Sequence, residues 1–118
     1  MKKHLLFATF SILTFYFSNV NAATCTALVS GNWSNPAIWS CGVLPSCGDV
    51  IVIPSGKTVL VDMMVNLDES SNPACSTAVS ITVYGIMEFK TGNKIRLSCG
   101  SWVEIMVGGQ MLKGKGGG

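Results

Sequence analysis

The chain has 118 residues, enough for a single domain, and 48% of them are hydrophobic. Its formal net charge is only +2, and the lysines and arginines are scattered among carboxylates. Phosphate backbones and anionic lipid surfaces both select clustered basic residues, so the composition argues against nucleic acid and against electrostatic membrane binding.

The first 22 residues have the pattern of a cleavable signal peptide. Residues 2–4 are Lys-Lys-His, residues 5–17 are apolar, and Ala22 is a small residue at the expected cleavage site. The apolar run is shorter than the roughly 20 residues that cross a bilayer, so we predict no membrane insertion after cleavage. Cleavage before Ala23 would leave a secreted or cell-surface (extracytoplasmic) chain with six basic and six acidic residues, because two of the eight basic residues lie in the leader.

Residues 23–48 follow the leader and contain many Trp, Cys, Ser, Asn, Pro and Gly residues without any sustained periodicity. This composition predicts an irregular N-terminal cap. The β-rich runs 50–53 and 58–61 flank a turn sequence, Pro-Ser-Gly, and predict a strand, a turn and a strand. The polar stretch 66–77 predicts a surface loop.

In the last third of the chain, apolar and polar residues alternate over 81–83, 87–89, 95–97 and 103–107, as in half-buried strands. A shift of 24 positions superposes Ile81 on Ile105, Val83 on Val107, Gly85 on Gly109 and Met87 on Met111. Self-similarity at such a period is typical of solenoids. We therefore predict an all-β fold, a short right-handed parallel β-helix over 49–118, with a β-sandwich as the alternative. The lack of a polar capping element at the C-terminal end predicts that the natural protein continues.

All five cysteines, Cys25, Cys41, Cys47, Cys75 and Cys99, follow the predicted cleavage site, in a compartment where disulfides persist. We expect Cys41 to pair with Cys47, closing a tight loop, and Cys75 with Cys99. Cys25 would then be unpaired or paired elsewhere. Zinc is the rival interpretation, but the sequence lacks the closely spaced cysteine pairs of zinc sites.

Residues 39–62, beginning Trp-Ser-Cys-Gly-Val-Leu-Pro-Ser-Cys-Gly-Asp, resemble the opening of the glycine-eight (G-eight) extracellular domain, and 81–89 and 107–112 fit its later part. The chain also resembles N-terminal β-solenoid modules of large bacterial cell-surface proteins. The resemblance implies an extracellular, strand-paired domain associated with ligand binding at cell surfaces. Some animal relatives of that family are hyaluronan-binding or hyaluronan-degrading proteins.

The sequence after the leader contains no histidine, which excludes Ser-His-Asp and Cys-His nucleophile systems. Glu88 and Glu104 are the candidates for two-carboxylate chemistry, with a solvated charge ladder that includes Arg96 as the alternative. We therefore predict no catalytic residue, no cofactor and no enzymatic activity.

Trp33, Trp39 and Trp102 are the binding candidates, because a flat indole can stack on the C–H face of a sugar ring. For Trp33 and Trp39 the alternative is burial as a lid over the first coil. Asp49 and Asp62 are weak metal candidates that would have to meet at one rim, and the alternative is that each caps backbone amides.

Taken together, these features predict an exported cell-surface or secreted structural or adhesive module, the N-terminal part of a larger surface protein. A carbohydrate-binding module, or a non-catalytic fragment of a polysaccharide-degrading enzyme, is the alternative. An extracellular polysaccharide or another surface ligand is the expected partner. We also expect Ile105 to point inward, so that Ile105→Asp would cost several kcal/mol and prevent folding.

Overall fold

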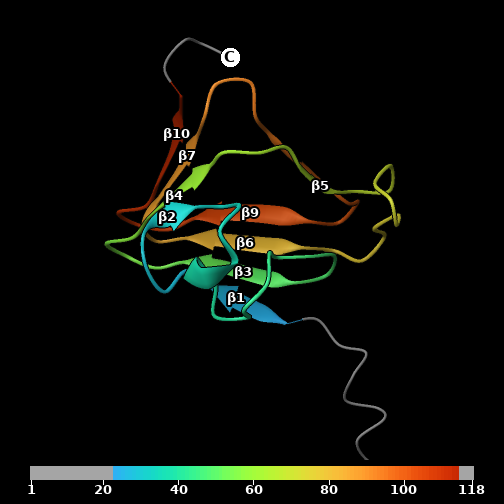
Figure 1. Ribbon diagram of the computed structural model, residues 1–118, viewed down its shortest axis with the longest axis horizontal. Helices are drawn as coiled ribbons and strands as arrows, with labels where there is room; N and C mark the ends of the chain where they lie inside the picture. Colours follow the sequence, from blue (N-terminus) through green and yellow to red (C-terminus); the bar gives the residue numbers. More distant parts are fainter. Residues whose placement is uncertain (1–22, 115–118) are drawn as a thin grey trace, which may run out of the picture.

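The computed structural model describes residues 23–114, and the predicted signal peptide over 1–22 lies outside the described residues. The described chain is all-β, with one 3-10 helix, η1 (Pro36–Ile38), and strands stacked in successive coils (Figure 1). The strands are β1 (Thr24–Thr26), β2 (Gly31–Asn32), β3 (Val50–Ile53), β4 (Thr58–Val61), β5 (Val65–Leu67), β6 (Ser80–Val83), β7 (Ile86–Phe89), β8 (Ile95–Leu97), β9 (Trp102–Ile105) and β10 (Gln110–Lys113).

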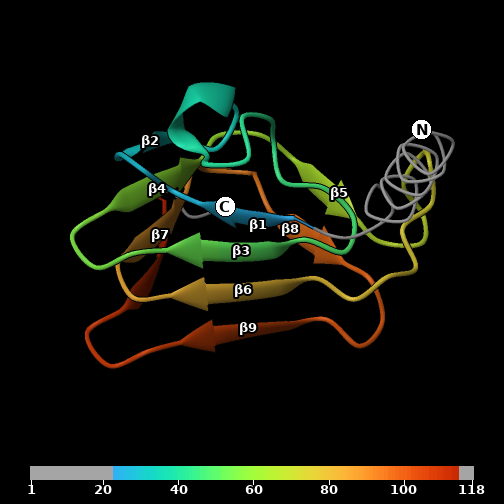
Figure 2. The ribbon, with the colours of Figure 1, turned by 90° about the horizontal axis from the view of Figure 1, so that it is seen from below.

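Three parallel sheets surround the core. The first sheet has the order β1-β3-β6-β9, the second β2-β4-β7-β10 and the third β5-β8, and successive strands of the chain lie in successive sheets. Figure 2 shows the four strands of the first sheet side by side. This arrangement confirms the predicted β-solenoid, and the sandwich alternative is wrong.

Alternate residues of each strand point inward and stack on their counterparts in the next coil. In the first sheet Ile51 pairs with Ile81 and Ile53 with Val83, and all four side chains are 0% exposed. Val59 and Met87 form the same kind of buried pair in the second sheet. Burial of apolar surface at about 25 cal/mol per Å² makes these rows the main stabilising feature of the stack.

The predicted repeat of 24 positions holds between β7 and β10 of the second sheet and is wrong for the first sheet. Met87 pairs with Met111 as predicted, whereas Ile81 pairs with Val103 rather than with Ile105. The reason is a difference in turn length, because residues 84–85 join β6 to β7 whereas residues 106–109 join β9 to β10. A shift of fixed size cannot follow both sheets when one corner is longer.

The two aligned glycines occupy equivalent places, because Gly85 immediately precedes β7 and Gly109 immediately precedes β10. A Cβ atom at Gly85 would collide with the carbonyl oxygens of Pro54 and Lys57, and one at Gly109 would collide with that of Val83. Close backbone approach between adjacent coils therefore explains why glycine recurs here.

The predicted cap segment over 23–48 also contains two short strands, β1 and β2, which belong to the first coil of the solenoid. β1 pairs with β3 and β2 pairs with β4, both in parallel. Only η1 and the loop that follows it cover the N-terminal end of the stack (Figure 2). The Asn35 side chain caps η1 by accepting a hydrogen bond from the Ala37 amide at 3.0 Å.

This covering segment closes the outer edge of β1. Ala27 and Trp39 form an antiparallel bridge. The Ser40 amide donates to the Thr26 carbonyl at 2.8 Å, and the Leu28 amide donates to the Ile38 carbonyl at 2.7 Å. The backbone groups of the edge strand are thereby satisfied by the chain itself.

Both predicted disulfide pairings are wrong. The bridges join Cys25 to Cys41 and Cys47 to Cys75, and Cys99 is a free, exposed thiol. Proximity along the chain is misleading for Cys47 and Cys75, because these residues are 28 positions apart and the stacking of adjacent coils brings them together. Cys47, Cys75 and Cys99 each precede a strand of the first sheet, so they occupy one corner of the solenoid in successive coils.

The C-terminal end of the stack differs from the N-terminal end. Every residue of β9 and β10 is exposed. Ile105 aligns with the buried Val83, which confirms its inward position, but its side chain remains 42% exposed. Its expected burial is therefore wrong. Among residues 23–114, the structure contains no helix long and apolar enough to cross a membrane.

Candidate functional site

Two of the three tryptophans are unavailable for a ligand. Trp33 is 1% exposed and Trp39 is 2% exposed. Their ring centroids are 5.0 Å apart at 69°, and Trp39 Nε1 donates to the Trp33 carbonyl at 3.1 Å. The edge-to-face pair is the lid over the first coil, so the assignment of Trp33 and Trp39 as sugar-stacking residues is wrong.

Trp102 is the remaining candidate, and it lies on the outer surface of the first sheet. It begins β9, is 55% exposed, and pairs in register with Ser80 of β6. Two positions farther along, Glu104 pairs with Thr82, and both belong to the same outward-facing set. We call the surface formed by Thr82, Trp102 and Glu104 the Trp102 face; Ser80 is buried and is not part of it.

The Trp102 face combines features that a sugar requires. Neighbouring strands are about 4.8 Å apart, so the indole lies next to hydroxyl and carboxylate groups on a regular, twisted sheet. An indole offers a flat apolar surface, and hydroxyl and carboxylate oxygens accept hydrogen bonds from sugar hydroxyls. The arrangement is suited to holding one face of a polysaccharide chain.

Asp49 is buried, 4% exposed, at the corner before β3. Its Oδ1 accepts from the Ala23 amide at 3.0 Å, and its Oδ2 accepts from the Ser46 amide at 2.8 Å and the Ser46 hydroxyl at 3.2 Å. The carboxylate therefore fastens the start of β1 to the corner that leads into β3, which is the amide-capping alternative for Asp49.

Asp62 lies at a different corner, immediately after β4. Its carboxylate accepts from the Ser34 amide at 3.0 Å and from the Ser34 hydroxyl at 2.6 Å. Burial acts to raise the pKa of Asp62, but these hydrogen bonds, with the nearby charge of Lys90, outweigh it and hold the pKa below its ordinary value.

The expected meeting of Asp49 and Asp62 at one rim is therefore wrong, since each fastens a separate part of the cap segment. Within residues 23–114, no group of three or more His, Cys, Asp or Glu side chains is placed to hold a metal ion.

Glu88 and Glu104 do not form a catalytic pair in the described structure. Glu88 lies in β7 of the second sheet and Glu104 lies in β9 of the first sheet. Arg96 lies in β8 of the third sheet, so the three charges project from three different sheets. The prediction that Glu88, Glu104 and Arg96 share one outer face is wrong.

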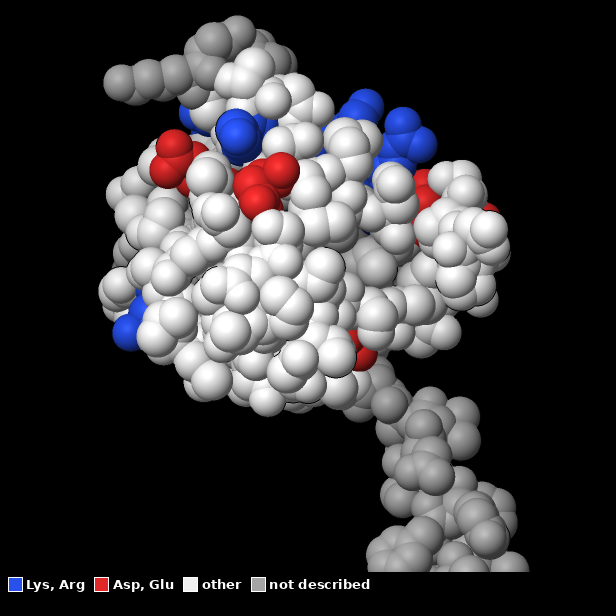
Figure 3. Space-filling view, viewed as in Figure 1, with Lys and Arg blue, Asp and Glu red and all other residues white. Residues whose placement is uncertain are grey.

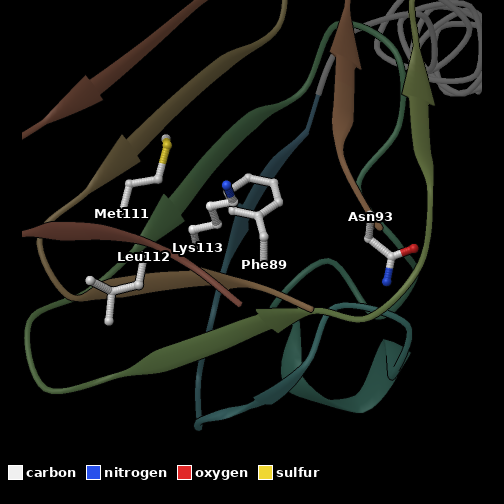
Figure 4. Close-up of a pocket in the computed structure, with 5 residues that line it drawn as sticks. All are labelled: Phe89, Asn93, Met111, Leu112 and Lys113. Carbon is white, nitrogen blue, oxygen red and sulfur yellow. The ribbon is translucent and has the colours of Figure 1, made fainter. Parts of the chain in front are cut away.

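Sequence reasoning missed two grooves. One, of about 280 Å³, is lined by Phe89, Asn93, Met111, Leu112 and Lys113 at the C-terminal end of the second sheet (Figure 4). The other, of about 180 Å³, lies beside the Cys47–Cys75 bridge and is lined partly by Ser46, Asn66 and Asn72. Both depend on segments far apart in the chain, so no local motif marks them.

Comparisons of the chain with protein-family models, with curated proteins and with solved structures find no match. The resemblance to the G-eight domain therefore stays a prediction.

Proposed function

We propose that the chain is an exported structural or adhesive module displayed at a cell surface or secreted, without enzymatic activity. The observation that carries the proposal is the pair of disulfides, Cys25–Cys41 and Cys47–Cys75. Disulfides of this kind persist in oxidising, extracytoplasmic compartments and are rare in reducing ones.

The positions of the two bridges support a mechanical role. Cys25 is in β1 and Cys41 follows η1, so the first bridge fastens the cap to the first coil. The second bridge joins adjacent coils at the corner that leads into the first sheet. A stack held at its cap and between its coils is suited to an exposed position where it must resist unfolding and proteolysis.

An uncharged surface at the N-terminal end supports adhesion. Residues 23–48 contain no Asp, Glu, Lys or Arg. Figure 3 shows charged atoms mainly around the margin of a broad uncharged area on the side of the molecule that faces the viewer in Figure 1. Leu28, Val29 and Val43 in this segment are 56%, 52% and 59% exposed, so it offers apolar contact area.

The non-enzymatic part of the proposal rests on the carboxylates. Asp49 and Asp62 are engaged in structural hydrogen bonds, and Glu88 and Glu104 lie in different sheets. Incubation of the purified chain with hyaluronan and other glycans should release no oligosaccharide. Any turnover above that of a heat-denatured control would contradict this part of the proposal.

Cell fractionation tests the location. In cells that produce the chain, we expect it in the medium or accessible to protease added to intact cells, with Cys25 and Cys41 oxidised. A cytoplasmic marker protein provides the control for lysis. A chain found only inside intact cells, with all cysteines reduced, would disprove an exported role.

Carbohydrate binding is the second candidate function, because Trp102 is 55% exposed on the outer surface of the first sheet. Native gel retardation on a panel of neutral and acidic polysaccharides should then slow the chain, and Trp102→Ala should restore free mobility. Tyr84→Ala is the matched control, since Tyr84 is 42% exposed outside the Trp102 face. Equal mobility on every polysaccharide would rule this candidate out.

A further inference from the structure

The groove beside the Cys47–Cys75 bridge is built entirely from residues 46–75. Its walls are the corner before β3, the strand β5 and the connection from β5 to β6, which projects from the stack in Figure 1. None of its lining residues comes from β8, β9 or β10. We call it the β5 groove.

The walls of the β5 groove are held in place by the chain itself. The Cys47–Cys75 bridge joins the corner to the connection. The Asp68 carbonyl accepts hydrogen bonds from the Ser71 amide at 3.1 Å, the Ser71 hydroxyl at 2.7 Å and the Cys75 amide at 2.9 Å, so the connection is folded around one point. A preformed site loses little conformational freedom when a ligand binds.

Two amide side chains line the groove and are available to a ligand. Asn66 in β5 and Asn72 in the connection are both exposed. Neither side-chain amide hydrogen-bonds to another residue within 23–114. Each offers an oxygen that accepts and an NH₂ group that donates. One amide can therefore accept a hydrogen bond from one ligand hydroxyl and donate a hydrogen bond to the next.

The backbone of β5 adds another donor and acceptor. The Val65 amide donates to the Lys94 carbonyl, so Val65 and Leu67 direct their backbone groups towards β8. Alternate residues of a parallel strand face opposite edges. Asn66 therefore directs its amide and carbonyl away from β8, at the edge of β5 that borders the groove.

The remaining lining is apolar or uncharged. Leu67, Pro73 and the disulfide supply apolar surface, and no Asp, Glu, Lys or Arg lines the groove. A charged ligand would lose hydration there without gaining an opposite charge. The volume, about 180 Å³, is below the roughly 300–1,000 Å³ of pockets for drug-sized molecules. The groove is thus suited to one small neutral ring that carries hydroxyl groups and an apolar face.

We propose that the β5 groove binds a single ring of a neutral sugar, with Asn66 and Asn72 hydrogen-bonded to its hydroxyls and Leu67 and Pro73 against its C–H face. The site is separate from the Trp102 face, because Trp102 belongs to β9 of the first sheet. It goes beyond the structural or adhesive role and does not depend on it. A groove of this size accepts one ring, such as the end of an oligosaccharide.

Titration with methyl glycosides of neutral hexoses and N-acetylhexosamines tests the site, with the isotope-labelled chain observed by NMR while both disulfides are intact. The side-chain amide signals of Asn66 and Asn72 should shift together and saturate. Asn66→Ala and Asn72→Ala should each weaken binding about tenfold, because each removes hydrogen bonds to the ligand. Asn32→Ala is the matched control, since Asn32 is exposed in β2 and does not line the groove.

Methyl glucuronoside provides the charged comparison. Arg96 lies beside Asn66 in β8 but does not line the groove, so the acidic sugar should bind no better than the neutral ones. A preference for methyl glucuronoside that Arg96→Ala removes would overturn the proposal, because the charge of Arg96 would then select the ligand.

Circular dichroism verifies that each variant is folded. The proposal would also be overturned if no glycoside of the panel shifted the Asn66 and Asn72 signals, or if both asparagine variants bound as tightly as the parent. Shifts confined to Trp102 and its neighbours would overturn the groove and support the Trp102 face instead. The exported role fails on different evidence, the cell fractionation, so the two failures are distinguishable.

Discussion

Asp49 and Asp62 have side chains that could bind a ligand, but in this structure their carboxylates accept hydrogen bonds from backbone amides. Both carboxylates accept hydrogen bonds from the N-terminal segment, Asp49 from Ala23 and Ser46 and Asp62 from Ser34. Trp33 and Trp39 behave in the same way, since their rings pack against each other beneath the cap. At the scale of residues, most candidate site groups in the first half of the chain hold the cap in place.

The Asp62–Ser34 contact makes stability depend on pH. Because the folded-state pKa of Asp62 lies below its ordinary value, the contact stabilises the fold above about pH 4 and is lost as the pH falls through the folded-state pKa. Ser34→Ala removes the hydroxyl hydrogen bond, so the variant should be less stable than the parent at pH 7. Urea unfolding at several pH values measures this difference, which should shrink as the pH falls below about 4 and Asp62 becomes protonated. A difference that stays constant with pH would show that Ser34 acts by packing alone.

At the scale of elements, rows of buried apolar side chains hold the strands together. At the corners, a disulfide bridge and close backbone contacts between adjacent coils fix the structure. The inward rows are continuous from one coil to the next, so each strand depends on its neighbours for burial. The Cys47–Cys75 bridge fixes the corner before β6, where the connection from β5 is longest.

Removal of this bridge should lower the free energy of unfolding by about 3 kcal/mol, because a loop of this length gains that much chain entropy in the unfolded state. The paired variant Cys47→Ala and Cys75→Ala tests it by urea denaturation. Cys99→Ala is the matched control and should leave the midpoint nearly unchanged, since Cys99 is exposed and unpaired. Equal losses in both variants would contradict the assigned connectivity.

The inward rows also predict a contrast between two positions in the same row. Val83 is 0% exposed, whereas Ile105, its partner in β9, is 42% exposed. Val83→Asp should prevent folding, because it buries a charge without a partner. Ile105→Asp should keep the β-sheet circular dichroism and a cooperative melt, with a much smaller loss. Unfolding of both variants would contradict the exposed position of Ile105.

At the scale of the whole molecule, the two ends of the stack are chemically different. The N-terminal end is closed by η1 and by a segment that pairs with β1, and its surface carries no charge over residues 23–48. The C-terminal end presents edge strands and apolar side chains. Among the described residues, the chain itself therefore covers the N-terminal end of the stack only.

The sequence predicts the class of fold because burial in a strand is periodic, and the runs at 81–83 and 103–107 carry that period. It predicts Asp49 and Asp62 as notable residues but not their partners, which come from the cap segment. The predicted disulfide pairings are wrong for a similar reason, since Cys47 and Cys75 come together only when adjacent coils stack. The predicted register of β6 with β9 is wrong because the corner at 106–109 is longer than the corner at 84–85, and no local sequence pattern reveals this difference.

Mass spectrometry of the chain recovered outside producing cells, after alkylation of free thiols, tests the central claim most directly. We predict a chain that begins at Ala23, a single alkyl group on Cys99, and disulfide-linked peptides that join Cys25 to Cys41 and Cys47 to Cys75. Five alkylated cysteines, or a linkage between Cys41 and Cys47, would contradict the account of an exported solenoid held together by these two bridges.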